Sequence, residues 1–236
     1  ATTEIYPLSL HDALPISYDY FRNRLMIPIC DERGRVVGFG ARALDPNEKA
    51  KYINSPQGEL FDKSGLLFGL DRAKAAIRES ETAIIVEGYM DAIQAHQAGY
   101  RNVVAQMGTA LTETQLKLIA PRSAKKILLA LDSDAAGQNA TRRSLEVARN
   151  TLEADYSGRL SIDIRILQIH EGKDPDDVLR EHPARFQEYI DAALPVADFV
   201  IDMETAELSA QASVQEREAV ARRVLPIDRK STRLNS

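Results

Sequence analysis

Hydrophobic and polar positions alternate in two different ways along the chain. In the front part, two strand-like runs at 25–29 and 36–42 are separated by DERGR, whose aspartate, glycine and charged residues suit a hairpin turn. The stretch 51–70 is rich in loop-forming and aromatic residues, and a helix capped by Asp71 is expected to follow it, through about residue 79. This pattern predicts a small mixed α+β lobe.

Behind this lobe, short apolar runs alternate with segments of helical period. The run at 83–86 is too short for a lone helix and too uniformly apolar for a half-exposed strand, so we expect a buried parallel strand. Strand and helix alternate at this spacing further along, which predicts an α/β fold with a largely parallel sheet flanked by helices and followed by a helical tail. The expected strands are 83–86, 103–107, 126–132 and 162–169; the expected helices are 89–98, 111–120 and 136–154, short helices after Pro175 and Pro183, and a tail over 196–224.

Composition limits the class of protein. The chain has 236 residues, 44% of them hydrophobic and 28% charged, and a formal net charge of −5. This is ordinary for a globular protein and leaves room for a local basic patch. The only cysteine, Cys30, excludes an internal disulfide and a cysteine-based zinc site. With no membrane-length apolar run and no signal-peptide pattern, we expect a cytoplasmic protein.

Acidic residues follow the apolar runs. The strand at 83–86 leads into Glu87 and Gly88, with Asp91 four positions after Glu87. The strand expected at 126–132 ends in Asp132, and Asp134 follows two positions later. A helix N-cap explains one of these two aspartates but leaves the other unexplained, which favours a divalent-cation site.

A third acidic segment follows the strand at 162–169. Asp174 and Asp176 flank Pro175, and taken alone this segment is more typical of a helix start. However, carboxyl ends of parallel strands meet at one edge of a sheet, and crowded carboxylates repel one another unless cations neutralise them. Together the three segments therefore predict a magnesium-type site of the kind used in phosphoryl transfer.

The order and spacing of these acids resemble a known fold. EGYMD (87–91), DSDAAG (132–137) and KDPDD (173–177) resemble the three acidic motifs of the Toprim fold, which primases, topoisomerases and some nucleases share. The resemblance implies a Toprim-type sheet. It also implies that Glu87, Asp132 and Asp134 bind metal and act in catalysis, that Asp174 and Asp176 help to hold a second metal, that Asp91 supports the site, and that the cofactor is Mg²⁺ or Mn²⁺, without zinc in this chain.

The front lobe narrows the resemblance. GFGAR, KYINSP and FDKSGLLFGL resemble segments of the bacterial replicative DNA primase, and the similarity covers roughly 20–201. Arg42, Lys51 and Lys63 match basic residues of a track that leads template and nascent RNA to the metals, so the resemblance implies contact with nucleic acid or nucleotide. The alternative for each is a solvated surface charge.

The resemblance implies an enzyme, a nucleotidyltransferase that makes short RNA primers. Its partners would be a single-stranded DNA template, ribonucleoside triphosphates, the RNA primer and, through a region outside this chain, the replicative helicase. It would act in the bacterial cytoplasm at the replication fork, as part of the primosome. Two alternatives remain: DNA cleavage by a Toprim nuclease or topoisomerase, and a non-catalytic nucleic-acid-binding fragment.

The chain also departs from the family pattern. Ser133 stands where the family often has glycine, and the family's zinc ribbon, part of its first lobe and its helicase-binding region are missing, which argues against activity of the chain by itself. The expected divisions are a non-native leader at 1–17, part of the N-terminal catalytic lobe at 18–80, a Toprim domain at 81–193, the start of a helical region at 194–229, and a non-native tail at 230–236.

Overall fold

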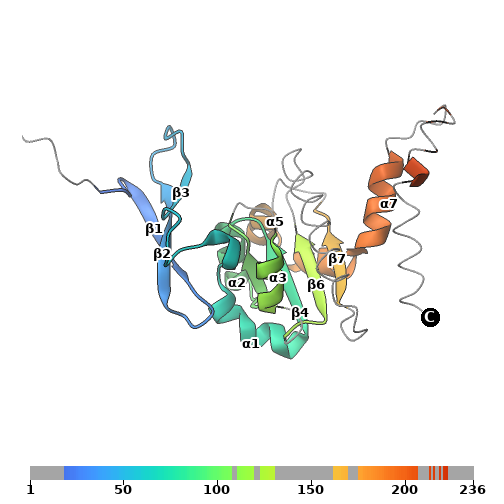
Figure 1. Cartoon of the computed structure of the whole chain (residues 1–236), viewed down its shortest axis with the longest axis horizontal. Coiled ribbons are helices and arrows are strands. Elements are labelled where there is room, and N and C mark those ends of the chain that lie inside the picture. Colours follow the sequence, from blue (N-terminus) through green and yellow to red (C-terminus); the bar gives the residue numbers. More distant parts are fainter. Residues whose placement is uncertain are drawn as a thin grey trace, which may run out of the picture.

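The computed structural model describes residues 19–107, 111–119, 123–130, 162–169 and 175–206, together with 213, 215, 218 and 220–222. Within this part of the chain a three-stranded antiparallel sheet, in the order β1-β2-β3, precedes a five-stranded sheet in the order β5-β4-β6-β7-β8 (Figure 1). This is the predicted small lobe followed by a largely parallel sheet. The second sheet carries the candidate site.

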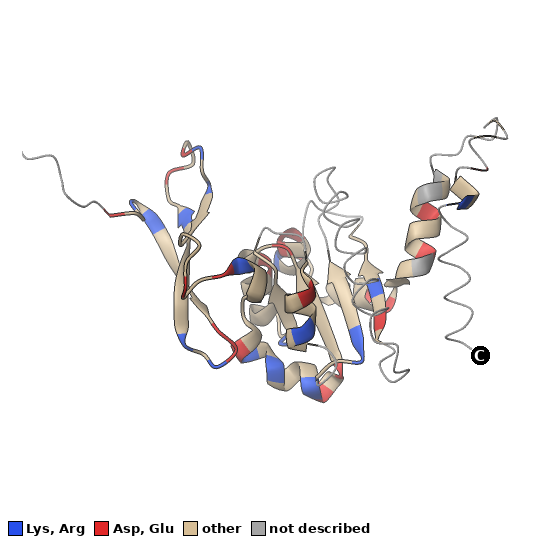
Figure 2. Ribbon diagram, in the orientation of Figure 1, with Lys and Arg blue, Asp and Glu red and all other residues tan. Residues whose placement is uncertain are grey.

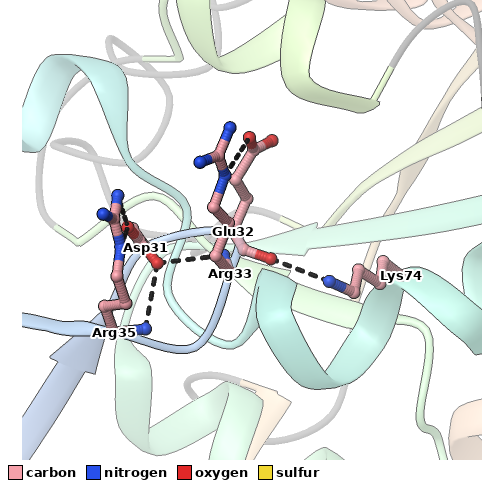
Figure 3. Close-up of polar contacts among 5 residues, drawn as sticks. All are labelled: Asp31, Glu32, Arg33, Arg35 and Lys74. Carbon is pink, nitrogen blue, oxygen red and sulfur yellow. Dashed lines mark hydrogen bonds and ion pairs between the residues drawn. The ribbon is translucent and has the colours of Figure 1, made fainter.

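The small sheet is built on a hairpin. β1 (Arg24–Cys30) and β2 (Val36–Ala43) pair antiparallel, and β3 (Tyr52–Asn54) adds a short third strand to β2. The predicted turn between β1 and β2 is confirmed, and one side chain closes it: the Asp31 carboxylate accepts hydrogen bonds from the backbone N–H of Arg33 at 2.9 Å and of Arg35 at 3.0 Å (Figure 3).

The same turn connects the two lobes. The Arg35 backbone N–H is the largest of the influences that lower the pKa of Asp31, and the Arg35 side chain, at 2.7 Å from Nε to Oδ2, adds to it. At the tip, Lys74 Nζ donates to the backbone oxygen of Glu32 at 2.9 Å (Figure 3). Because Lys74 belongs to the first helix after the small lobe, this bond fixes the hairpin against the larger domain.

The larger sheet has four parallel strands and one short antiparallel edge strand. β4 lies between β5 and β6, β7 pairs with β6, and β8 runs antiparallel to β7. The prediction of a buried central strand is confirmed, because residues 83–86 of β4 are all buried. The strands are β4 (Thr82–Val86), β5 (Val103–Ala105), β6 (Lys126–Ala130), β7 (Asp163–Leu167) and β8 (Leu194–Pro195).

Helices cover both faces of this sheet. On one face, α1 (Leu70–Ser80), α3 (Glu113–Ile119) and α7 (Val196–Ala206) pack in a core cluster with Ile85. On the other, α2 (Tyr89–Gln97), α5 (Pro175–Glu181) and α6 (Pro183–Asp191) pack in a second cluster with Ile84. Because neighbouring side chains of a strand point to opposite faces, β4 contributes to both cores, which explains its continuous apolar run.

The structure differs from the predicted elements at the start of α1 and in two short strands. Asp71 does not cap α1; the N-cap is Gly69, with a φ of 79°, and Asp71 lies in the first turn. The short strands β3 and β8 were not predicted, since three and two residues are too few to show a period. The helix expected over 136–154 and the two ends expected to be non-native lie outside the described residues, so those expectations stay predictions. None of the described helices has the length and apolar character needed to cross a bilayer.

Candidate active site at the carboxyl edge of the large sheet

Glu87 follows β4 directly, and backbone hydrogen bonds fix its position. Gln106 N–H donates to the oxygen of Val86 at 3.0 Å, and Met107 N–H donates to the oxygen of Glu87 at 2.9 Å. These bonds extend the pairing of β4 and β5 past the end of both strands. The Glu87 side chain is half-buried, so a carboxylate stands at the carboxyl edge of the sheet on a fixed backbone.

Gly88 and Asp91 form the turn from β4 into α2. The backbone N–H of Gly88, the N-cap of α2, donates to Asp91 Oδ2 at 3.0 Å. A β-carbon on Gly88 would lie 2.9 Å from that same oxygen, closer than real contacts allow. The close approach of the Asp91 carboxylate therefore favours glycine at position 88. The backbone conformation does not, because a φ of −106° is open to any residue.

Asp91 also links α2 to α5. Its side chain is buried, and Oδ1 accepts a hydrogen bond from the backbone N–H of Asp176 at 3.3 Å. With one oxygen bonded to Gly88 and the other to Asp176, Asp91 joins the first and third acidic motifs. The structure thus brings Asp176 to the end of the sheet where Glu87 and Asp91 lie, although it is 85 positions from Asp91 in the sequence.

Asp176 lies in the first turn of α5 and has a basic neighbour. Arg180 Nη1 lies 3.9 Å from Asp176 Oδ2, while Arg180 Nη2 lies only 2.7 Å from Asp177 Oδ1. The closer and better hydrogen-bonded partner of Arg180 is therefore Asp177. Since the Asp176–Arg180 contact lies at the limit of an ion pair, it does not commit the Asp176 carboxylate to Arg180.

The remaining predicted ligands, Asp132, Asp134 and Asp174, lie outside the described residues. Ala130, at the end of β6, pairs with Val86 of β4, and Asp132 comes two positions later in the sequence. Within the described part of the chain, no group of three acidic, histidine or cysteine side chains is close enough to hold a metal ion. The described candidates offer only oxygen atoms, which fit hard cations such as Mg²⁺. The five-residue ligand set stays a prediction, because three of its members lie outside the described residues.

Two of the three predicted basic residues meet at one aromatic ring. Arg42, in β2, and Lys51, just before β3, lie over the ring of Tyr52, at 5.8 Å and 5.6 Å from its centroid. The Tyr52 ring in turn packs edge-on against Tyr89, the first residue of α2, with centroids 5.6 Å apart. The basic side of the small lobe therefore contacts the helix that starts at the acidic edge.

Tyr52 and Tyr89 were not among the predicted site residues. For Tyr52, an aromatic residue beside a lysine in KYINSP was the available signal. Tyr89 is buried, and its hydroxyl has no hydrogen-bond partner in the described structure. Burial, with a smaller contribution from Tyr52, raises the pKa of Tyr89 to about 12 against the opposing effect of Arg24 and Arg42. The hydroxyl therefore stays neutral at physiological pH.

Lys63 lies in a separate turn that α3 holds. It begins η1 (Lys63–Gly65), a turn of 3₁₀ helix capped by Asp62, whose Oδ1 accepts from the backbone N–H of Ser64 at 2.9 Å. The side-chain hydrogen bond from Ser64 is the largest influence that lowers the pKa of Asp62. Lys63 is half-buried, and the described part of the chain holds no ion pair with its side chain.

Known protein families match each of the two lobes. A family model described as "DNA primase catalytic core, N-terminal domain" matches residues 8–74, and one described as "Toprim-like" matches residues 84–179. The DNA primase of Clostridium acetobutylicum is 44% identical over 186 residues, which cover 78% of this chain and 29% of that protein. The chain therefore spans less than a third of this relative.

Solved structures show the same likeness. A structure of the DnaG catalytic core is 32% identical with a TM-score of 0.77, and the match covers 91% of this chain and 67% of that one. The DnaG primase catalytic domain bound to single-stranded DNA is 34% identical with a TM-score of 0.75, over 89% of this chain and 64% of that one.

The fold and the two family matches define a Toprim-type domain joined to a primase-type N-terminal lobe. The chain belongs to the bacterial DNA primase family. Toprim primase cores are in general metal-dependent.

Proposed function

We propose that the chain forms the catalytic core of a primase, which synthesises short RNA primers on single-stranded DNA by metal-dependent nucleotidyl transfer. The observation that carries this proposal is the contact between the two lobes. The basic residues Arg42 and Lys51 meet at Tyr52, whose ring packs on Tyr89 at the start of α2, two positions after Glu87. The basic residues and the acidic edge are thus neighbours, an arrangement that supports a role in template-directed synthesis.

The acidic edge would hold the metals. We assign Glu87, Asp132 and Asp134 to one Mg²⁺ or Mn²⁺ ion, and Asp174 and Asp176 to a second. Bound there, the metals would supply charge neutralisation at the triphosphate and activation of the primer 3′-hydroxyl. Asp91 would act as a positioning residue, because both of its oxygens already accept backbone hydrogen bonds.

The basic residues would bind and orient the strands. Arg42, Lys51 and Lys63 would contact phosphates of the template, the primer or the incoming ribonucleoside triphosphate. Phosphate contacts of this type fix register and orientation, which is much of what catalysis by positioning requires. The solved relative bound to single-stranded DNA supports DNA binding by this core.

We also propose a wider biological setting for the full-length protein. The full-length protein would act in the bacterial cytoplasm at the replication fork, within the primosome, and would meet the replicative helicase through a region outside this chain. The two alternatives, DNA cleavage and nucleic-acid binding without catalysis, are disfavoured by the match of the front lobe to the primase N-terminal domain.

One experiment separates the three functions. The 236-residue chain and a full-length primase that carries this core are each incubated with a single-stranded template, labelled ribonucleotides and Mg²⁺. The proposal predicts new RNA of primer length from the full-length protein and template binding by the chain. Cleaved template would favour the nuclease alternative, and binding without synthesis by the full-length protein would favour the non-catalytic one.

A further inference from the structure

A single buried glutamine fixes the turn that carries Lys63. Gln115, in α3, is completely buried, and its amide nitrogen donates to the backbone oxygens of Lys63 at 3.0 Å and of Leu66 at 2.8 Å. Its amide oxygen accepts from the backbone N–H of Thr112 at 3.0 Å. Three of the four hydrogen bonds that a glutamine amide can form are therefore made, and two of them hold the Lys63 turn.

Thr112 holds the same turn from the next position. Its hydroxyl donates to the backbone oxygen of Ser64 at 2.6 Å and accepts from the backbone N–H of Gln115 at 3.1 Å. Thr112 and Gln115 thus form a reciprocal capping box at the start of α3, the pattern that T-x-x-Q predicts. Here the side chains of the box also bind three carbonyl groups of another segment, those of Lys63, Ser64 and Leu66.

The segment after the Lys63 turn is anchored to the large sheet as well. Phe68 and Ala105 exchange backbone hydrogen bonds of 2.8 Å and 3.0 Å, so this segment adds to β5. The turn lies beside α3, near the middle of Figure 1. The backbone of the Lys63 turn and of the segment after it is therefore held by hydrogen bonds to α3 and β5. These bonds do not use the side chain of Lys63.

We propose that the Thr112–Gln115 capping box positions Lys63 for contact with nucleic-acid phosphate. In this proposal Gln115 and Thr112 touch no substrate; they act through the Lys63 backbone. The proposal rests on the proposed function, since it assumes that Lys63 binds nucleic acid. It adds two residues that neither the acidic motifs nor the basic track contain.

The two roles open to Gln115 differ in what they predict. A purely structural residue would lower the stability of the chain and would leave the affinity for DNA unchanged, or weaken it independently of Lys63. A positioning residue should weaken DNA binding through Lys63 alone. A double-mutant cycle between Gln115 and Lys63 distinguishes these outcomes, because residues that act as one unit give non-additive effects.

The test measures binding of single-stranded DNA to the 236-residue chain by fluorescence anisotropy over a range of salt concentrations. The variants are Lys63→Ala, Gln115→Met and the double variant, with Gln97→Met, at an exposed position of α2, as the matched control. Gln115→Met and Gln97→Met are uncharged changes, so neither alters the number of charges that face the DNA. Circular dichroism and thermal melts report on the fold of each variant.

We expect Lys63→Ala to weaken binding by about five- to tenfold and to reduce the salt slope by about 0.7, the value for one phosphate contact on a single strand. Gln115→Met should match both changes, the double variant should bind no more weakly than Lys63→Ala, and Gln97→Met should bind as the wild type does. Unchanged binding in Gln115→Met, or losses that multiply in the double variant, would overturn the positioning role.

A second pair of variants keeps the test valid if Gln115→Met does not fold. Thr112→Val removes the hydroxyl that reaches Ser64, whereas Thr112→Ser keeps it. The proposal predicts weaker binding and a smaller salt slope for valine and wild-type values for serine; equal binding by the two variants would refute it. If Lys63→Ala itself has no effect on binding, the assignment of Lys63 in the proposed function fails, which is a distinct result.

Discussion

The two sheets of this protein differ in where they carry the charged residues of the candidate site. The large sheet is covered on both faces, its strands β4 and β5 carry no charged residue, and the candidate acids come only after the strands end. The small sheet is partly exposed, with outward Met26, Phe39 and Tyr52, and Arg42 lies within a strand. Figure 2 shows the contrast, with few charges on β4 and β6.

This difference has a physical cause. A strand buried on both faces cannot carry a charge in its middle without a large desolvation cost, so polar chemistry is confined to its ends. A strand with one exposed face can hold a cation over an aromatic ring, as Arg42 does over Tyr52. The position of Glu87 is therefore fixed by the core of the large domain, and that of Arg42 by surface contacts. Substitutions in the two regions should therefore have different effects on activity, stability and DNA binding.

The largest effect is expected at Glu87. In a full-length primase that carries this core, Glu87→Gln removes a charge without changing size and should reduce primer synthesis by at least about 10²-fold, with little change in the fold. Asp132→Ala should reduce primer synthesis to a similar extent. A primer-extension assay with labelled ribonucleotides measures the loss. Glu79→Gln, an exposed carboxylate near the opposite end of β4, is the matched control and should keep full activity.

The next effect tests the support of that edge. Gly88→Ala brings a β-carbon to within 2.9 Å of Asp91 Oδ2, so the carboxylate must move and its hydrogen bonds to Gly88 and Asp176 weaken. We expect a loss of about 1–3 kcal/mol in the free energy of unfolding, together with reduced synthesis. Urea denaturation measures the first quantity. Gly58→Ala, where the added β-carbon meets no atom within 4 Å, should change neither.

A smaller and different effect is expected in the basic lobe. Lys51→Ala should weaken binding of single-stranded DNA by about three- to tenfold and lower the salt slope by about 0.7, without changing stability. Anisotropy titrations at several salt concentrations provide both values. Lys125→Ala removes the same charge beside Glu81, before β6, and should bind as the wild type does. Equal losses in the two variants would mean that only the net charge matters.

The smallest effect is expected at Tyr89, where the two regions meet. Its buried hydroxyl has no partner among the described residues, so Tyr89→Phe should alter stability at pH 7 by no more than about 0.5 kcal/mol. Tyr100→Phe, in contrast, removes a 2.9 Å hydrogen bond to the oxygen of Pro183 and should cost about 1 kcal/mol.

Alkaline pH sharpens the Tyr89 comparison. An unfolded tyrosine ionises near pH 10, whereas folding raises the pKa of Tyr89 to about 12. The unfolded state therefore loses its proton first, and the wild type should lose stability relative to Tyr89→Phe as the pH rises from 10 to 12, by about 1 kcal/mol per pH unit. Denaturation curves at pH 7 and 11 test this; parallel stability profiles would contradict it.

Much of this architecture could be predicted from the sequence, because burial on both faces leaves a plain record. The apolar run before Glu87 and the alternation behind it identified β4 and the parallel sheet, and D-E-R-G-R identified the hairpin. The start of α1 was missed because Gly69 in a left-handed conformation replaced the expected side-chain cap. The start of a helix can thus depend on a backbone conformation that the side-chain pattern does not reveal.

The site was harder to predict for the same reason. Sequence spacing indicated that acids gather at one edge, yet the bond from Asp176 to Asp91 joins residues 85 positions apart and leaves no local signal. The packing of Tyr52 on Tyr89 and the reach of Gln115 to Lys63 are likewise long-range contacts. The metal and DNA ligands that the motifs indicated stay predictions, whereas the long-range contacts that support Asp176, Tyr52 and Lys63 emerged only from the fold.

In the proposed function the acidic edge binds divalent metal while the basic lobe binds nucleic acid. Titration of the chain with Mn²⁺, followed by electron paramagnetic resonance, tests it most directly. We predict that Glu87→Gln weakens Mn²⁺ binding by at least about tenfold, while Lys51→Ala binds Mn²⁺ as the wild type does. Equal Mn²⁺ affinity in the wild type and Glu87→Gln would contradict the claim.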